Sequence, residues 1–112
     1  SETRRGGNRV DCNQLTNLVN KESACLVDVR PKSEFETGAI AGSVNIPFEE
    51  LDRRNDELLK EKENPLVLIC KMGRNAALAG EKMQKYGYNK THVLQGGITS
   101  WQQEGLPLVK IK

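Results

Sequence analysis

One cysteine lies where a parallel sheet commonly carries reactive groups. Residues 66–69 (LVLI) form a continuous apolar run, which predicts a strand buried on both faces. Cys70 follows directly, then a short loop containing Gly73, and then a helix whose periodic residues start near Ala76. Open α/β sheets hold their active sites at this end of the strands. The pattern predicts a nest of backbone N–H groups with a thiol at its floor.

The neighbours of Cys70 favour its ionised form. The positive end of the following helix, the loop N–H groups, Lys71 and Arg74 would all stabilise a thiolate. Keeping an ordinary thiol ionised near neutral pH takes roughly 2 kcal/mol of preferential stabilisation, and a helix terminus supplies about 0.3–1 kcal/mol. The amides and at least one cation must therefore contribute. We predict a nucleophilic cysteine acting on a small anionic substrate; the alternative is an inert cysteine buried at a strand end.

Length and charge exclude several other classes of function. A chain of 112 residues is long enough for one domain with a real core. Its net charge of +2 comes from 17 basic and 15 acidic residues that are well mixed, which argues against a nucleic-acid surface. No apolar run approaches the roughly 20 residues that span a bilayer, so no membrane contact by this segment is expected.

The cysteine and histidine content argues against a metal site. There are three cysteines without a C-x-x-C pair, and His92 is the single histidine, which we interpret as a structural strand residue. The odd cysteine count also argues against a disulfide framework, so a reducing compartment such as the cytoplasm fits best. We expect Cys12 to be an exposed spectator thiol and Cys25 to be a packed core residue.

Strand and helix patterns alternate along the chain. The basic, glycine-containing residues 1–9 are expected to form a flexible tail or linker, and residues 10–112 the domain. We predict strands at 24–29, within 39–47, at 66–69 and at 91–94. Helices are predicted at 10–20 (with Asp11 as N-cap), 31–37, 48–61, from about 76 to Gly87, and, after a turn at 95–97, from about Ile98 to Gly105. This alternation predicts a parallel sheet with helices on both faces. The turns after Val29, Ile69 and Leu94 should then surround one pocket.

Two further features of these turns have open interpretations. A carboxylate at Asp28 would be buried near a strand end and needs a partner, which Arg30 or nearby amides could supply. The pair could order a loop or take part in the chemistry. Gly96 and Gly97 could bring backbone close to a substrate or simply form a tight turn.

Four segments, in order, resemble the motifs of one known family. They are LVDVR (26–30), ETGAIAGSVNIP (36–47), CKMGRNA (70–76) and LQGGITSW (94–101). Together they are similar to the rhodanese domain of sulfurtransferases, over residues 10–112. The resemblance implies a three-layer α/β domain on a five-stranded parallel sheet with helices on both faces. It also implies that Cys70 carries a persulfide.

Three positions compare informatively with that family. Ala39 stands where many members have histidine, at a place usually remote from the sulfur chemistry. Asn75 stands where many have arginine, serine or threonine; asparagine can hydrogen-bond but brings no charge. Lys71 retains a cation beside the sulfur.

The resemblance and the residues together imply a double displacement. The Cys70 thiolate attacks the outer sulfur of thiosulfate, sulfite leaves, and cyanide, a thiol or a protein acceptor then removes the sulfur. No metal or organic cofactor is needed. Asp28 and Arg30 join the predicted substrate-binding set, and the remaining members are the loop residues, which supply amides and cations: Lys71, Met72, Gly73, Arg74 and Asn75.

Two other functions compete with this one. A cysteine phosphatase would need arginine six residues after the cysteine to clamp phosphate, but that residue is Ala76 and the loop is one residue short. A persulfide carrier or regulatory binding module with low turnover would use the same fold, and the uncharged Asn75 is compatible with it. Related bacterial proteins sometimes carry a membrane-anchoring helix before such a linker, and the basic residues 3–6 are compatible with a tether of that kind.

Overall fold

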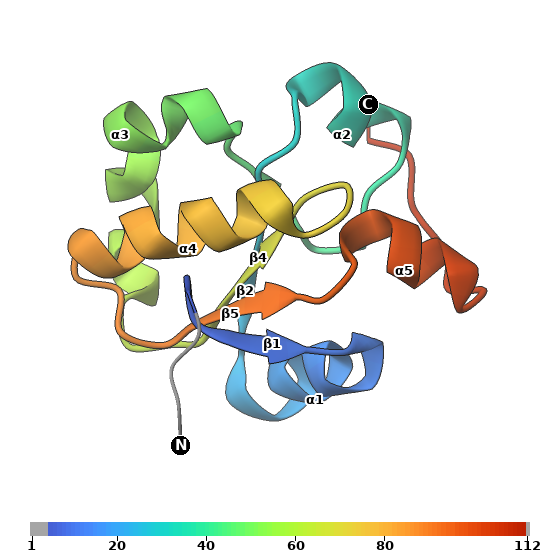
Figure 1. The fold of residues 1–112 in the computed structure, drawn as a ribbon, viewed down its shortest axis with the longest axis horizontal. Coiled ribbons are helices and arrows are strands. Elements are labelled where there is room, and N and C mark those ends of the chain that lie inside the picture. The colour runs from blue at the N-terminus through green and yellow to red at the C-terminus, as the bar shows by residue number, and fades with distance from the viewer. Residues whose placement is uncertain (1–4, 112) are drawn as a thin grey trace.

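A computed structural model describes residues 5–111 and contains one parallel sheet of five strands. The order across the sheet is β1-β5-β4-β2-β3, so the strand that leads to Cys70 is central (Figure 1). Every neighbouring pair in it is parallel. The strands are β1 (Asn8–Val10), β2 (Cys25–Asp28), β3 (Val44–Asn45), β4 (Leu66–Ile69) and β5 (Thr91–Leu94).

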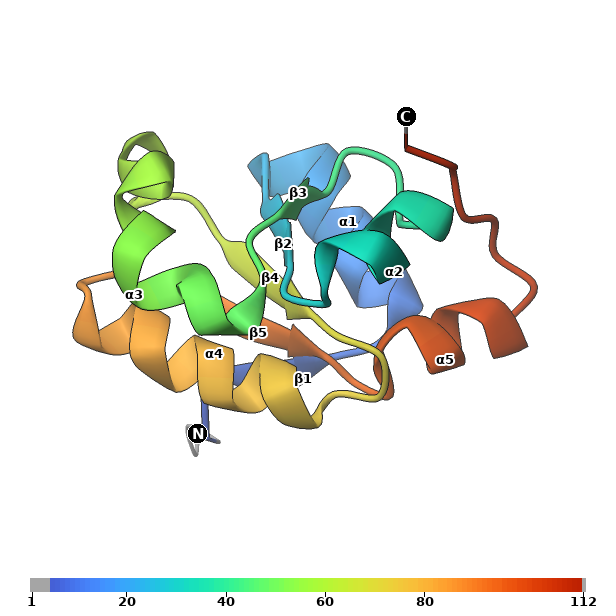
Figure 2. The same ribbon diagram turned by 90° about the horizontal axis from the view of Figure 1, so that it is seen from above.

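Helices cover both faces of this sheet, as the alternating pattern predicts (Figure 2). The α-helices are α1 (Cys12–Glu22), α2 (Lys32–Thr37), α3 (Leu51–Arg54), α4 (Arg74–Lys85) and α5 (Gly97–Gln103). Leu66 and Leu68 of β4 pack in one core cluster with side chains of α3 and α4. Val67 and Ile69 pack in a second cluster, with α1 and α5. The fully apolar β4 therefore divides two hydrophobic layers, which fixes the position of the residue that follows it.

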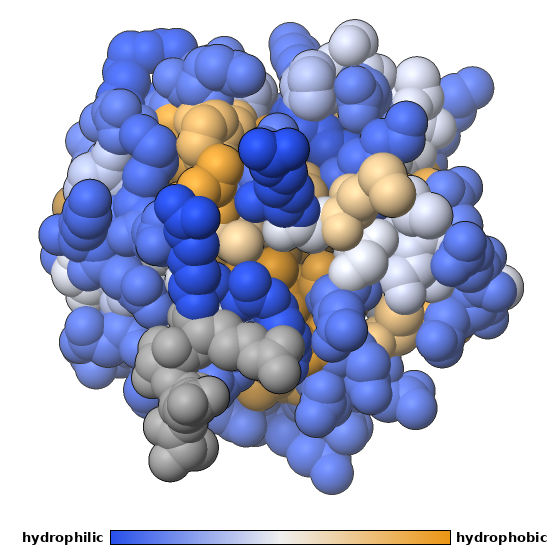
Figure 3. Space-filling view, in the orientation of Figure 1, coloured by the Kyte–Doolittle hydropathy of each residue, from blue (hydrophilic) through white to orange (hydrophobic). Residues whose placement is uncertain are grey.

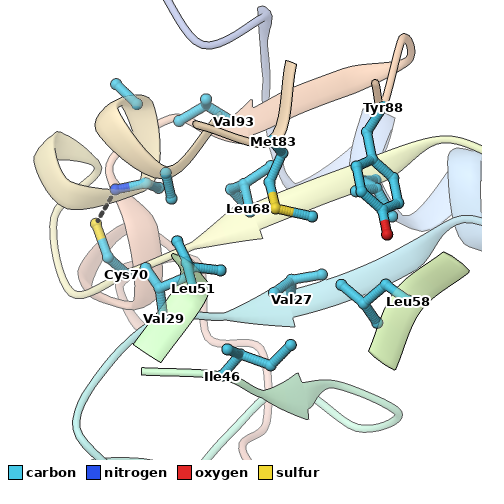
Figure 4. Packing of buried hydrophobic residues seen from close by; sticks show 14 residues of the cluster. Val27, Val29, Ile46, Leu51, Leu58, Leu68, Cys70, Met83, Tyr88 and Val93 are labelled. Carbon is cyan, nitrogen blue, oxygen red and sulfur yellow. Dashed lines mark hydrogen bonds between the residues drawn. The ribbon is translucent and has the colours of Figure 1, made fainter. Parts of the chain in front are cut away.

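The first of these clusters extends beneath the cysteine loop. Figure 4 shows Cys70, Val29 and Leu51 side by side at one end of it, and Tyr88 and Leu58 at the other (Figure 4). Leu51 is fully buried and Val29 nearly so. The floor of the loop is therefore packed rather than solvent-filled.

Helix α1 has the predicted cap but buries an unexpected residue. The Asp11 carboxylate accepts from the Gln14 N–H at 2.8 Å, and the Gln14 side chain accepts from the Asp11 N–H at 2.8 Å, which completes a capping box. Cys12, the first residue of the helix, is only 2% exposed and packs in the second cluster. The prediction of an exposed Cys12 is therefore wrong, because the inner face of α1 begins one turn earlier than its leucines indicate.

Part of the expected N-terminal tail belongs to the fold. Residues 8–10 form strand β1, which pairs with β5 from Asn8 opposite His92. Gly6 packs so closely on α4 that a Cβ there would lie 2.1 Å from the Ala77 carbonyl oxygen, and a Cβ on Gly80 would lie 2.1 Å from that of Gly6. The boundary predicted at residue 9 is thus wrong for this stretch, and the expected tail at residues 1–4 lies outside the described part of the chain.

The long helix predicted over residues 48–61 is divided into three short pieces. Residues Phe48–Glu50 and Asn55–Glu61 are 3₁₀ turns on either side of α3. The Asn55 side-chain amide donates to the Leu51 and Asp52 carbonyl oxygens, and the Asn55 backbone carbonyl oxygen accepts from the Tyr88 hydroxyl at 2.8 Å. These bonds compete with the regular helical ones at this point.

Across residues 5–111, none of the helices is both long enough and apolar enough to cross a lipid bilayer.

Candidate active site at the Cys70 loop

The Cys70 sulfur is held by two backbone amides. Cys70 directly follows β4 and is only 5% exposed. Sγ accepts hydrogen bonds from the Gly73 N–H at 2.9 Å and the Ala76 N–H at 3.3 Å; the dashed line in Figure 4 marks one bond from a backbone nitrogen to this sulfur. Both donors favour negative charge on the sulfur. Of the amides of residues 71–75 that the sequence predicts around the sulfur, that of Gly73 donates to Cys70 Sγ, and the second donor, Ala76, lies one residue beyond that range.

The sulfur also takes the place of a helix cap. Gly73 is the N-cap of α4 and has no side chain that could accept from the first turn. The Ala76 N–H, third in the helix, therefore bonds to Cys70 Sγ instead. Gly73 has a φ of 107°, a left-handed conformation that favours glycine. This backbone bend points its own N–H at the same sulfur.

Helix α5 fixes the loop from the other side. The Ile98 N–H donates to the Cys70 carbonyl oxygen at 2.9 Å, and the Thr99 N–H donates to that of Lys71 at 3.0 Å. Gly97 lies so close that a Cβ would be 2.3 Å from the Cys70 carbonyl oxygen. Of the two interpretations of the Gly96–Gly97 turn, the geometry supports close approach, but to the cysteine loop. The turns after Ile69 and Leu94 therefore meet, as predicted.

The remaining loop side chains face solvent. Lys71, Arg74 and Asn75 are exposed, and Met72 is 68% exposed. No ion pair within residues 5–111 involves Lys71 or Arg74. A cation in the first turn of a helix opposes the helix dipole, so Arg74 there weakens α4 slightly.

Asp28 and Arg30 form a buried ion pair. The Arg30 guanidinium donates to both carboxylate oxygens of Asp28, at 2.9–3.2 Å, and to the Gly38 carbonyl oxygen at 2.7 Å. The Asn45 side-chain amide donates to the carbonyl oxygens of both residues at 2.9 Å. These bonds tie the turn after β2 to the segment after α2. They favour the structural alternative for the pair over its predicted place in the substrate-binding set.

Replacing Arg30 should destabilise the whole domain. In Arg30→Met, the Asp28 carboxylate, which is fully buried, loses its partner. Breaking one side of a buried pair costs about 3–5 kcal/mol, and urea unfolding followed by circular dichroism should show a loss of this size. Arg53→Met is the matched control, because its guanidinium is 71% exposed and pairs with Glu50 at 3.4 Å, and it should change little. Equal stabilities of the two variants would contradict the structural role.

The other two cysteines are held as neutral thiols. Burial raises the pKa of the Cys25 thiol to about 11, and burial also raises the pKa of Cys12. Cys25 packs at the edge of the first cluster, in agreement with its prediction as a core residue. Neither contacts the Cys70 loop through any hydrogen bond within the described residues.

Cys25 should therefore resist alkylation at ordinary pH. With a pKa of about 11, only about 0.1% of this thiol is ionised at pH 8, and the thiolate is the reactive form. Because the pKa is raised, each further pH unit up to about 11 should increase its rate of reaction with iodoacetamide close to tenfold. Mass spectrometry of the Cys25 peptide over pH 7–10 measures this rate. A rate that levels off below pH 9 would contradict the assignment.

His92 lies in β5, opposite Val67 of the neighbouring strand β4, and is not part of the cysteine loop. Its Nδ1 is buried without a hydrogen-bond partner among the described residues, and burial lowers the pKa of the imidazole. A neutral ring in the sheet fits its prediction as a structural residue. No group of three or more His, Cys, Asp or Glu side chains between residues 5 and 111 is arranged to hold a metal ion.

Comparison with known proteins identifies the family. The model of the rhodanese-like domain family matches residues 11–104. The chain belongs to the rhodanese-like family. The Cys70 loop, with its sulfur under the first turn of α4, is thus the corresponding loop of a rhodanese-like domain. Ala39, where many family members have histidine, is buried and forms an isolated bridge to Val109, outside the five strands of the sheet.

Individual relatives agree with this assignment. The protein YibN of Escherichia coli strain K12 is 36% identical over 100 residues, which cover 88% of this chain and 70% of that protein. A protein of Allochromatium vinosum named sulfurtransferase is 30% identical over 103 residues, covering 91% of this chain and 94% of its own. A rhodanese-related protein from Thermoplasma volcanium has the same fold, with a TM-score of 0.81, 31% identity and coverage of 91% and 97%.

Proposed function

We propose that this rhodanese-like domain is a sulfurtransferase that carries sulfane sulfur on Cys70 and accepts it from thiosulfate. The observation that supports this most directly is the pair of N–H groups, from Gly73 and Ala76, directed at one sulfur at the end of the central strand. A thiolate in such a place is both stabilised and poised to attack. The sulfurtransferase name of the Allochromatium relative supports the same class of reaction.

The first half of the reaction loads the cysteine. Cys70 Sγ attacks the outer sulfur of thiosulfate, the new Sγ–S bond forms, and the S–S bond of thiosulfate breaks with its electron pair leaving on sulfite. A cysteine persulfide anion remains, and total charge is conserved. Lys71 and Arg74 attract the dianion to the loop.

The second half of the reaction removes the sulfur from the Cys70 persulfide. A nucleophile, cyanide or a thiol, attacks the outer sulfur, and the Sγ–S bond breaks with its electron pair returning to Cys70. With cyanide the product is thiocyanate. Sulfur is passed on without net oxidation or reduction of the enzyme, so the scheme needs no cofactor.

Intact mass spectrometry tests the loading step. Protein treated with thiosulfate and freed of excess reagent should gain about 32 Da, one sulfur atom. Peptide mapping should place the gain on the peptide that contains Cys70, and addition of cyanide should remove it. A gain on Cys12 or Cys25, or no gain while sulfite is still released, would overturn the proposal.

The second candidate is a persulfide carrier that docks to a protein partner. The observation in its favour is the 68% exposure of Met72, an apolar side chain two residues from the thiol. Steady-state formation of thiocyanate from thiosulfate and cyanide separates the two. A carrier would load one sulfur per chain and then cycle slowly, whereas an enzyme would turn over many times.

A further inference from the structure

A basic recess lies beside the Cys70 loop. It has a volume of about 460 Å³ and is lined by Arg5, Arg9, Arg74 and three residues of the loop and α4: Gly73, Ala77 and Leu78. Figure 3 shows strongly hydrophilic residues around more apolar ones on the face that carries α4 and β1 (Figure 3). Three arginines, two from the N-terminal segment and one from the start of α4, therefore line the same recess.

The recess carries net positive charge, and backbone contacts hold its N-terminal side in place. Arg5 pairs with Glu81 at 2.9 Å, and among residues 5–111 no carboxylate forms an ion pair with Arg9 or Arg74. Arg9 Nη1 donates to the carbonyl oxygens of Arg5 and Gly7 at 2.7 and 2.9 Å, and no hydrogen bond within residues 5–111 involves its other side-chain nitrogens. The close packing of Gly6 on Gly80 holds this segment against α4. The cations are thus positioned before any ligand arrives.

The recess adjoins the loop that holds the Cys70 sulfur. Gly73 is one of its walls and also donates the 2.9 Å hydrogen bond to Cys70 Sγ. Arg74 is the next residue along the chain. A molecule bound between the arginines would therefore place its other end within reach of the loop.

Size and lining indicate what kind of molecule fits. Small-molecule sites are about 300–1,000 Å³, whereas a single water takes about 30 Å³ of liquid, so this recess is far larger than thiosulfate needs. Arginine favours carboxylates and phosphates, which it binds in bidentate fashion. Ala77 and Leu78 supply apolar surface for a carbon chain. The fit is to an organic molecule with several anionic groups.

We propose that the arginine recess binds the anionic groups of a low-molecular-weight thiol that accepts sulfur from Cys70. The inference rests on the proposed persulfide function and adds the acceptor class and its site. In the transfer, the acceptor thiol loses its proton to solvent and its sulfur attacks the outer sulfur of the Cys70 persulfide. The acceptor S–S bond forms, the Sγ–S bond breaks, and the products are the acceptor persulfide anion and the Cys70 thiolate. Charge and electrons balance without an added oxidant.

Acceptor kinetics provide the first test. Protein loaded with sulfur from thiosulfate is mixed with glutathione, which carries carboxylates, with coenzyme A, which carries phosphates, or with neutral 2-mercaptoethanol. In Arg5→Gln and Arg9→Gln, the kcat/KM for the preferred anionic thiol relative to 2-mercaptoethanol should fall about five- to tenfold, the scale of one charge-assisted hydrogen bond. Arg53→Gln, an exposed arginine of α3, is the charge-matched control and should keep the wild-type ratio. The thiol whose kcat/KM falls more in these variants identifies the anionic group that the arginines bind, carboxylate or phosphate.

A binding measurement separates this inference from the function it rests on. S-methylglutathione and desulfo-coenzyme A cannot accept sulfur, so they are titrated into Cys70→Ser protein while backbone amide shifts are followed by NMR. Shifts at Gly73 and Ala77 that weaken in Arg9→Gln support the recess even if thiosulfate loading fails. Three results would overturn the proposal. The first is a kcat/KM ratio that stays at the wild-type value in both Arg5→Gln and Arg9→Gln. The others are an absence of shifts at these amides and displacement of the probes by an acidic peptide that binds more tightly.

Discussion

Cys70→Ser is expected to abolish sulfur transfer. Serine preserves the shape of the loop and can still accept from the Gly73 and Ala76 N–H groups, so the domain should fold. Its hydroxyl forms no persulfide. Thiocyanate formation should fall by at least about 10³-fold, the scale seen when a catalytic nucleophile is removed, and the mass gain of about 32 Da should vanish.

Variants of the other cysteines make this result specific. Cys25→Ala and Cys12→Ala should keep the mass gain and the rate, because burial holds both thiols in their neutral form. Cys12→Ala should be less stable, since Cys12 is packed in the second cluster. Sulfur transfer by the Cys70→Ser variant would contradict the assignment of Cys70 as the residue that carries sulfur.

Gly97→Ala is expected to disable the loop although Gly97 lies outside it in sequence. The new Cβ would lie 2.3 Å from the Cys70 carbonyl oxygen and 2.6 Å from that of Lys71, and both are backbone atoms that cannot move aside cheaply. The loop must shift, which displaces Sγ from its two donors. A displacement near 1 Å can cost about 10²-fold in rate, so we expect a loss of that order in thiocyanate formation.

Gly105→Ala is the matched control for this change. Gly105 has a φ of 77°, comparable to the 59° of Gly97, but no atom lies within 4 Å of its Cβ position. Both variants suffer the strain of a left-handed alanine, about 1 kcal/mol or more, and only Gly97→Ala adds the contact with the loop. If Gly105→Ala lost as much activity as Gly97→Ala, the effect would come from general strain. Thermal unfolding of both variants separates stability from rate.

The sequence predicts the core of the fold because its signals there are local. The apolar run at 66–69, the N-cap at Asp11 and the glycine turns each depend on residues close in the chain, and the structure has all of them. The position of Cys70 follows from the same logic. A residue directly after a buried central strand must lie at the edge of the sheet.

The features that sequence reasoning missed depend on distant partners. Strand β1 has three residues and no clear periodicity, and it exists through pairing with β5, more than 80 residues away. The burial of Cys12 depends on how α1 sits on the sheet. The bond from Ala76 to Cys70 could have been expected, because an N-cap glycine leaves the third amide of a helix without a partner.

Because the Cys70 sulfur caps α4, a chemical change at this sulfur should alter how often the first turn of the helix opens. When that sulfur gains an outer atom or is alkylated, the charge facing the Ala76 amide changes, and the first turn of α4 must respond. Deuterium uptake at Gly73 and Ala76 would then report how many molecules are loaded at a given moment. If Cys70 carries sulfur as proposed, exchange at these two backbone amides should thus measure the fraction of loaded molecules.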